Sequence, residues 1–239
     1  MLKESENLEI LGKVNKKILQ KREGFHFSTD PILLANFIEI SKNIKIADLG
    51  TGSAIMPLLL ADNENIDEIY GFEIQEEIAD MATRTIELND LESKIKIYNI
   101  DINEIEATKN KVDLIITNPP YMKLEDGKIS SNLEKAISRH EVKLKLSQLI
   151  KKASEMLNKK GSFNIIFRTE RLEELLEILK INKLYTKRIR FIYSKKGKTS
   201  KLFMLEAKKN IKNTLQIEET LYIYNQNNSY TNEVLKYYE

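Results

Sequence analysis

The chain has 239 residues, of which 41% are hydrophobic, and it contains no cysteine and two histidines. A chain of this length can bury a hydrophobic core without disulfides or structural metal ions. The lack of cysteine excludes disulfides, cysteine-ligated zinc and thiol nucleophiles, and two histidines cannot form a multi-histidine metal site, so we expect no metal. The first residues are charged, and no apolar run approaches the roughly 20 residues of a membrane span. We therefore expect a cytoplasmic protein with no membrane segment.

The net charge is only +2, but the charges are unevenly distributed. Residues 62–106 contain 14 acidic and 3 basic side chains, whereas residues 183–213 contain 11 basic side chains and Glu206 as their one acid. Such asymmetry favours contact with a polyanion such as nucleic acid, and the basic candidates are Lys195, Lys196 and Lys198. A solvated, lysine-rich surface would give the same pattern.

Apolar runs alternate with helical patterns along the chain. After a helix that starts within residues 28–31, strands are expected at 44–49, 66–74, 94–100, 112–118 and 162–168, and helices at 53–61, 75–90, 143–161 and 171–180. Gly161 is typical of a residue that ends a helix. The basic segments 185–194 and 201–209 indicate an antiparallel pair, and a short strand and a helix are expected after residue 213.

Strands that alternate with helices predict an α/β protein with a Rossmann-like, doubly wound, mostly parallel sheet. The basic pair fits an antiparallel hairpin at the edge of that sheet. We expect a single domain over residues 1–239. It comprises an N-terminal extension and helix (1–41), a catalytic core (42–210) and a C-terminal strand and helix (211–239).

The segment DLGTGSAI (48–55) lies between the first core strand and the next helix. Gly50 permits a sharp turn and Gly52 a close approach of the backbone to a ligand, but Ile55 replaces the third glycine of a dinucleotide fingerprint. Glu73 ends the second strand, where a carboxylate can accept both hydroxyls of a ribose, and Asp101 follows the third strand. The pattern indicates an adenosine ligand without a pyrophosphate, as in S-adenosylmethionine. The alternatives are an ordinary strand–helix turn for the two glycines, a solvated strand end for Glu73 and an aspartate turn for Asp101.

The segment TNPPYMK (117–123) follows the apolar run VDLII. Pro119 and Pro120 lack backbone N–H groups and end the strand at a rigid stub. The side-chain oxygen of Asn118 and the carbonyl of Pro119 can accept from the two N–H groups of an aromatic amine and localise its lone pair, while Tyr121 can stack on the base. These four residues are the catalytic candidates. A rigid Asn-Pro turn is the alternative.

Together, the segments DLGTGSAI, FEIQEEIADMA and TNPPYMK resemble the class I S-adenosylmethionine-dependent amino-methyltransferases. The segments GFHFSTD (24–30), SRHE (138–141), FRTERLEELL (167–176) and SYTNEV (229–234) resemble the bacterial tRNA-valine adenine-N6 methyltransferases within that class. The resemblance covers about residues 9–234. Ala54 departs from the glycine that is usual in this family, and Met122 stands where an aromatic residue often follows the tyrosine.

The resemblance implies N6 methylation of an adenine in tRNA, with no obligate protein partner. It also implies the residues of the site. The cofactor-binding residues, with their sequence neighbours, are Phe27, Ser28, Asp48, Gly50, Thr51, Gly52, Glu73, Ile74, Asp101, Ile102 and Asn118. For the segment 25–30 the alternative is a helix cap at Ser28, Thr29 or Asp30, with Pro31 at the first helical position. The residues that would contact RNA are Arg139, His140 and Arg168, and Arg171 would contact a phosphate. For all four residues, the alternative is a position on a solvated helix flank.

Other functions share parts of this pattern. Protein-glutamine methyltransferases that act on release factors carry Asn-Pro-Pro-Tyr, but they usually have a sizeable N-terminal helical domain, and only about 40 residues precede the first core strand here. A DNA adenine methyltransferase would need a target-recognition domain. A non-catalytic RNA-binding module is opposed by the intact Asn118 and glycines, and an NAD-dependent oxidoreductase is opposed by Ile55.

Overall fold

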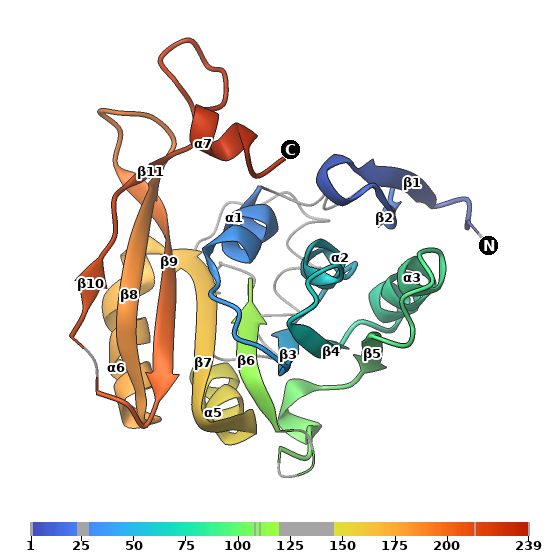
Figure 1. The fold of residues 1–239 in the computed structure, drawn as a ribbon, viewed down its shortest axis with the longest axis horizontal. Helices are drawn as coiled ribbons and strands as arrows, with labels where there is room; N and C mark the ends of the chain where they lie inside the picture. Colours follow the sequence, from blue (N-terminus) through green and yellow to red (C-terminus); the bar gives the residue numbers. More distant parts are fainter. Residues whose placement is uncertain are drawn as a thin grey trace, which may run out of the picture.

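The computed structural model describes residues 2–22, 29–107, 109, 111–119, 146–212 and 214–238. Their central feature is a nine-stranded sheet in the order β10-β8-β9-β7-β6-β3-β4-β5, with β11 pairing with β8 (Figure 1). The strands are β3 (Ile44–Leu49), β4 (Ile66–Glu73), β5 (Ile95–Asn99), β6 (Val112–Thr117), β7 (Leu157–Arg168), β8 (Leu184–Tyr193), β9 (Ser200–Lys209), β10 (Gln216–Ile217) and β11 (Leu221–Tyr222). Among these strands, β9 alone runs antiparallel to its neighbours. The predicted fold class and the basic hairpin, β8–β9, are confirmed.

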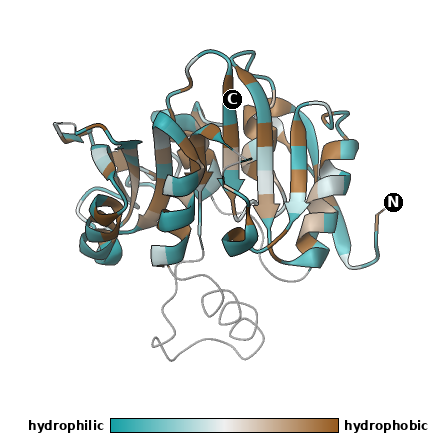
Figure 2. Ribbon diagram, turned by 90° about the horizontal axis from the view of Figure 1, so that it is seen from below, coloured by the Kyte–Doolittle hydropathy of each residue, from teal (hydrophilic) through white to brown (hydrophobic). Residues whose placement is uncertain are grey.

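Helices cover both faces of the sheet. They are α1 (Asp30–Phe37), α2 (Ile55–Leu60), α3 (Glu76–Glu87), α5 (Leu146–Met156), α6 (Leu172–Ile181) and α7 (Asn232–Leu235), with 3-10 turns η1 (Gly12–Val14), η2 (Ile102–Glu104) and η3 (Thr169–Arg171). Because side chains alternate along a strand, Ile46 of β3 joins the core with α1, α2 and α3, and Ala47 joins the core with α5 and α6. Accordingly, the inner strands are largely apolar, while the helices turn hydrophilic residues outward (Figure 2).

No helix within the described ranges combines the length and apolar character that crossing a membrane requires. The predicted short strand and helix in the C-terminal tail are present as β10, β11 and α7.

An N-terminal hairpin, β1 (Glu6–Leu11) with β2 (Lys16–Lys21), forms a separate two-stranded sheet that the sequence did not predict. Its buried positions include charged residues. Glu6 accepts a hydrogen bond of 2.8 Å from Arg84 of α3, and the buried Lys16 donates one of 2.6 Å to Asp62. Since ion pairs occupy positions where an apolar residue is usual, the period-2 apolar signal of a half-buried strand is missing.

The helix predicted to end at Gly161 ends instead at Met156, and β7 begins at once. Lys160, not Gly161, adopts the left-handed conformation, with φ of 72°. Gly161 is required for space, because a Cβ there would lie 2.9 Å from Leu157 Cδ2 and 3.1 Å from the Asp113 carbonyl oxygen. The ammonium of Lys209, from β9, donates to the carbonyl of Ser154 in the last turn of α5 and so replaces a glycine cap with a tertiary contact.

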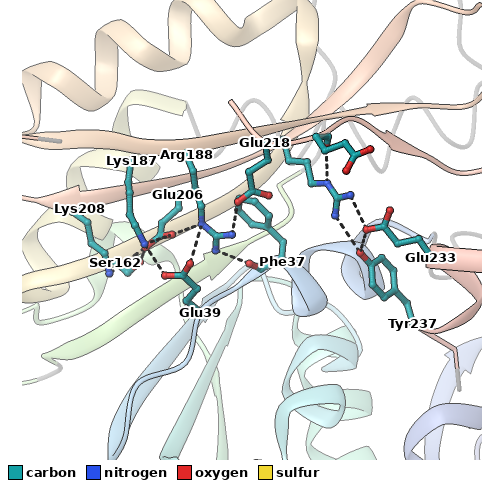
Figure 3. Close-up of polar contacts among 12 residues, drawn as sticks. Phe37, Glu39, Ser162, Lys187, Arg188, Glu206, Lys208, Glu218, Glu233 and Tyr237 are labelled. Carbon is teal, nitrogen blue, oxygen red and sulfur yellow. Dashed lines mark hydrogen bonds and ion pairs between the residues drawn. The ribbon is translucent and has the colours of Figure 1, made fainter. Parts of the chain in front are cut away.

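A buried arginine joins the sheet to α1 and to the C-terminal tail (Figure 3). Arg188 of β8 donates at 2.6 Å to Glu206 of β9, at 2.8 Å to Glu218 and at 2.6 Å to the carbonyl of Phe37, and its guanidinium lies 4.0 Å from the Phe37 ring centre. Burial alone would raise the pKa of Glu206, but the hydrogen bond from Arg188 and the charge of Lys208 hold that pKa below its ordinary value. The pair is therefore ionised at neutral pH.

This network corrects the view of residues 183–213 as one outward-facing basic surface. Arg188 is buried, and three further basic side chains form ion pairs with glutamates; these are Lys187 with Glu39 and Glu206, Arg190 with Glu233, and Lys208 with Glu206. Three glutamates from outside the segment, Glu39, Glu218 and Glu233, thus offset part of its charge excess.

Replacing Arg188 by methionine should lower the free energy of unfolding by about 3–5 kcal/mol, because Glu206 would stay buried without its most buried charge partner. Lys109→Met provides the control, since the Lys109–Glu106 pair is largely exposed, and it should change stability little. Urea unfolding of both variants at neutral pH measures the difference. A loss below about 1 kcal/mol for Arg188→Met would contradict this assignment.

Candidate active site

Four adjacent parallel strands bring the predicted site residues to one edge of the sheet. In the order β6-β3-β4-β5, Asp48 of β3 pairs with Ile116 of β6 and Gly71 of β4, and Glu73 pairs with Asn99 of β5. The loops after these strands therefore meet at the carboxyl edge, where open α/β sheets bind ligands.

The glycine loop after β3 adopts the backbone that its sequence predicts. Gly50 has φ of 79° and Gly52 has φ of 57°, both in the left-handed region that favours glycine. A Cβ at either position would meet no atom of the described residues within 4 Å, so those residues leave the space beside the loop open. The Gly50 and Thr51 N–H groups donate to the Phe72 carbonyl at 2.9 and 3.0 Å, which ties the loop to β4. The loop is thus held against β4 by two backbone hydrogen bonds, with its glycines facing space that the described residues leave open.

Asp48 lies fully buried at the end of β3. Its Oδ2 accepts a hydrogen bond of 2.8 Å from the Thr51 hydroxyl, whereas its Oδ1 has no hydrogen-bond partner within the described ranges. Burial raises the pKa of Asp48 to about 7, the Thr51 hydrogen bond opposes this, and the charge of Glu73 adds to it. An orphaned carboxyl oxygen beside a glycine loop is a feature that a polar or cationic ligand can satisfy.

Glu73, also buried, holds the other side of the loop. Its Oε2 accepts from the Gly52 N–H at 3.1 Å and its Oε1 from the Gln75 N–H at 2.9 Å. A carboxylate has about four lone-pair sites, so these two bonds leave capacity for two ribose hydroxyls. Ile74 follows, half-buried, at the start of the loop that leads into α3.

Asp101 is the N-cap of η2, which begins at Ile102 after β5. Oδ1 of Asp101 accepts from both the backbone N–H and the side-chain amide of Asn103, each at 2.9 Å. The aspartate turn, one of the two alternatives for Asp101, is therefore present. Its hydrogen bonds use Oδ1 and do not involve Oδ2. Ile102 is buried in the core with α5.

Asn118 and Pro119 follow the last residue of β6, half-buried and buried respectively. The hydroxyl of Thr117 donates to the Leu49 carbonyl at 2.7 Å, which fastens the end of β6 to the start of the glycine loop. The other two catalytic candidates, Pro120 and Tyr121, lie outside the described residues.

Four more candidates also lie outside the described residues: Phe27, Ser28, Arg139 and His140. The helix that follows Ser28 begins at Asp30 with Pro31 in its first turn, as predicted, but the Thr29 side chain makes no capping hydrogen bond.

The remaining RNA candidates lie at the same sheet edge. Arg168 is the last residue of β7, half-buried. The turn between β8 and β9 carries Lys195, which donates to Asn228, and the exposed Lys196 and Lys198. Arg171, by contrast, is buried, donates to Glu174 at 3.0 Å and lies over Phe167, so its interactions are internal.

Two residues that shape the site were missed in the sequence. Thr117 joins β6 to β3, as described above. Gly71 makes room for the glycine loop, because a Cβ there would lie 2.7 Å from Ile97 Cδ1 and 3.0 Å from the Thr51 hydroxyl. A glycine inside a strand is the signal that could have marked such a close approach. Over the described ranges, no group of three or more metal-ligating side chains occurs.

Asp48→Asn should change how stability depends on pH. Because the pKa of Asp48 in the folded protein, about 7, exceeds its ordinary value of 3.8, the wild type loses stability as pH rises from about 4 to 7. That loss reaches about 4 kcal/mol at most. Asparagine cannot ionise, so the variant should lack this decline. Urea unfolding at pH values between 5 and 8 measures it.

Thr51→Val removes the hydroxyl that stabilises the carboxylate and should move the wild-type decline to higher pH. Parallel stability–pH profiles for the wild type and Asp48→Asn would contradict the raised pKa.

Comparisons with known proteins agree with this geometry. The methyltransferase small domain model matches residues 27–188. A tRNA1(Val) (adenine(37)-N6)-methyltransferase of Actinobacillus succinogenes is 29% identical, over 87% of this chain and 86% of its own, and its namesake from Bacteroides thetaiotaomicron is 26% identical over 74% of each chain.

Solved structures share the fold. A predicted O-methyltransferase from Agrobacterium tumefaciens superposes with a TM-score of 0.70 at 20% identity, over 87% of this chain and 95% of its own. The structure of Trm5 from Methanocaldococcus jannaschii in complex with adenosine superposes with a TM-score of 0.60 at 17% identity, over 87% of this chain and 56% of its own. Since the family model spans more than half of the sequence, the chain belongs to the methyltransferase small domain family.

Proposed function

We propose that this enzyme uses S-adenosylmethionine to methylate the exocyclic N6 amine of an adenine in tRNA. The observation that carries the proposal is the meeting of the glycine loop and Asn118 at one sheet edge, where the Thr117–Leu49 hydrogen bond joins their strands. The names of the curated relatives support the acceptor. The proposed tRNA substrate supports a cytoplasmic location, because tRNA serves translation there.

The cofactor would be held by the glycine loop and the two carboxyl groups beside it. S-adenosylmethionine supplies an electrophilic methyl group on a sulfonium. Gly50 and Gly52 leave open space beside the loop, Glu73 retains lone pairs for the ribose hydroxyls, and the unpartnered Oδ1 of Asp48 suits a polar or cationic group. The donor set therefore fits an adenosine ligand that carries positive charge.

Asn118 and Pro119 would bind the acceptor amine. An aromatic amine is a poor nucleophile because its lone pair is delocalised into the ring. Two fixed acceptors, the Asn118 side-chain oxygen and the Pro119 carbonyl, favour a pyramidal nitrogen, and the proline ring limits the reorganisation that this requires. The product cation is acidic enough to lose its proton to water, so catalysis depends mainly on positioning.

The β8–β9 turn would supply affinity for the RNA backbone. Lys196 and Lys198 are exposed at the edge that carries Asn118, whereas the basic residues farther along β8 are paired internally. Phosphate contacts of this kind position a nucleic acid without reading its sequence.

Methyl transfer from radiolabelled cofactor to purified tRNA and, in parallel, to a release factor tests the proposal. The expected product is N6-methyladenosine, identified among the separated nucleosides. Label in a glutamine side chain would assign the protein-glutamine methyltransferase function instead, and RNA binding without transfer would indicate the non-catalytic module.

Asn118→Ala should reduce single-turnover methyl transfer to tRNA by roughly 100-fold or more, because a lost preorganised contact of this kind costs about 2.7–4 kcal/mol. Cofactor affinity, measured by calorimetry, should stay within a few-fold of the wild type. Asn118→Asp keeps an acceptor and should retain more activity than alanine.

Glu73→Ala is the matched control, since it should weaken cofactor binding by about 1.5–3 kcal/mol. A wild-type transfer rate for Asn118→Ala would place the catalytic centre elsewhere.

Replacing Lys195, Lys196 and Lys198 together by glutamine should weaken tRNA binding and flatten its dependence on salt by about two to three in the log–log slope. The matched control replaces three exposed lysines at the opposite sheet edge: Lys159, Lys180 and Lys212. It removes the same charge and should change the slope much less. Equal effects of the two triple variants would show that only net charge matters.

A further inference from the structure

Three tyrosines of the C-terminal tail form a continuous stack. The rings of Tyr224 and Tyr230 lie 5.2 Å apart at 13°, and those of Tyr230 and Tyr238 lie 5.5 Å apart at 21°. Tyr224 and Tyr230 face each other across an isolated antiparallel bridge that closes the turn between them. The stack therefore has two ends, Tyr224 and Tyr238.

The two ends differ in their surroundings. Tyr238 packs with Tyr230 against the core beside α1, and its hydroxyl donates to Thr29 at 3.4 Å. Tyr224, half-buried, is the ring at the outer end. A further ring can extend the stack at Tyr224 without displacing a core contact.

The Tyr224 end lies beside the basic turn at the carboxyl edge of the sheet. Its N–H donates at 2.9 Å to the carbonyl of Ser194, at the end of β8, and the loop after it accepts a hydrogen bond from Lys195 through Asn228. Lys196 and Lys198 are exposed in the same turn. An aromatic face beside exposed lysines is the combination that binds single-stranded nucleic acid, because bases stack and phosphates pair with the cations.

We infer that Tyr224 is a stacking platform for an unpaired base of the bound RNA, with Lys196 and Lys198 at the adjoining phosphates. The inference rests on the proposed function and extends it to a second nucleotide subsite. The path from β6 to β11 crosses four strand spacings of about 4.8 Å, or roughly 19 Å. Tyr224 therefore holds a different nucleotide from the one whose amine would meet Asn118.

The test measures binding of two labelled RNAs with equal numbers of phosphates, a hairpin with an unpaired loop and a fully paired duplex. Tyr224→Leu should weaken hairpin binding by about 5- to 150-fold, the equivalent of the roughly 1–3 kcal/mol that stacking contributes per base. Duplex binding should not change. The salt dependence of hairpin binding should keep its slope, because no charge is removed.

Three further variants serve as controls. Tyr224→Phe and Tyr224→Trp retain an aromatic face and should bind the hairpin like the wild type. Tyr185→Leu is the matched control, since Tyr185 is equally half-buried but lies at the other end of β8; it should leave both affinities unchanged.

Unchanged hairpin affinity in Tyr224→Leu, or an equal loss for hairpin and duplex, would overturn the inference. Methyl transfer to tRNA is assayed separately. A wild type that binds the hairpin through Tyr224 but transfers no methyl group would refute the proposed function and leave the stacking platform in place.

Discussion

The hydrogen bond from the Thr117 hydroxyl to the Leu49 carbonyl fixes the relation between two strand ends on which the candidate site depends. One strand leads into the glycine loop and the other into Asn118. Because side chains alternate along a strand, a slip of one residue between β3 and β6 would turn Asn118 to the opposite face of the sheet. In the observed register Asp48 pairs with Ile116, and the buried, apolar side chains of both strands stabilise that register.

A second constraint acts at the far side of the sheet. Arg188 contacts β9, the end of α1 and the C-terminal tail at once, so the tail that carries the tyrosine stack is attached to the same core as the candidate site. Arg190 reinforces this through Glu233 of α7. Part of the basic composition thus serves assembly of the fold, and the turn after β8 carries two of the exposed lysines, Lys196 and Lys198.

The core strands could be predicted because they are short, isoleucine-rich apolar runs bounded by turn residues, and the glycine loop, Glu73 and Asn118 because they lie at or just after the ends of those strands. The β1–β2 hairpin and the end of α5 depend on distant partners, such as Arg84 and Lys209, that local patterns do not contain. The conformation of Ala54 is likewise not predictable from local sequence patterns. Its φ is 66°, a conformation that costs an L-residue about 1–2 kcal/mol, and its methyl group is fully buried in the core.

The buried carboxyl of Asp48 links the occupancy of the loop to protons in the solvent. At neutral pH a group with a pKa of about 7 is half protonated, and a cation placed beside it favours the ionised form. Binding of a sulfonium cofactor would then release, on average, a fraction of a proton from Asp48. The heat of binding measured by calorimetry would therefore vary with the ionisation enthalpy of the buffer. The demethylated product has lost that charge and would release less. The same residue would therefore hold the charged reactant more tightly than the spent product as the pH rises, which favours turnover.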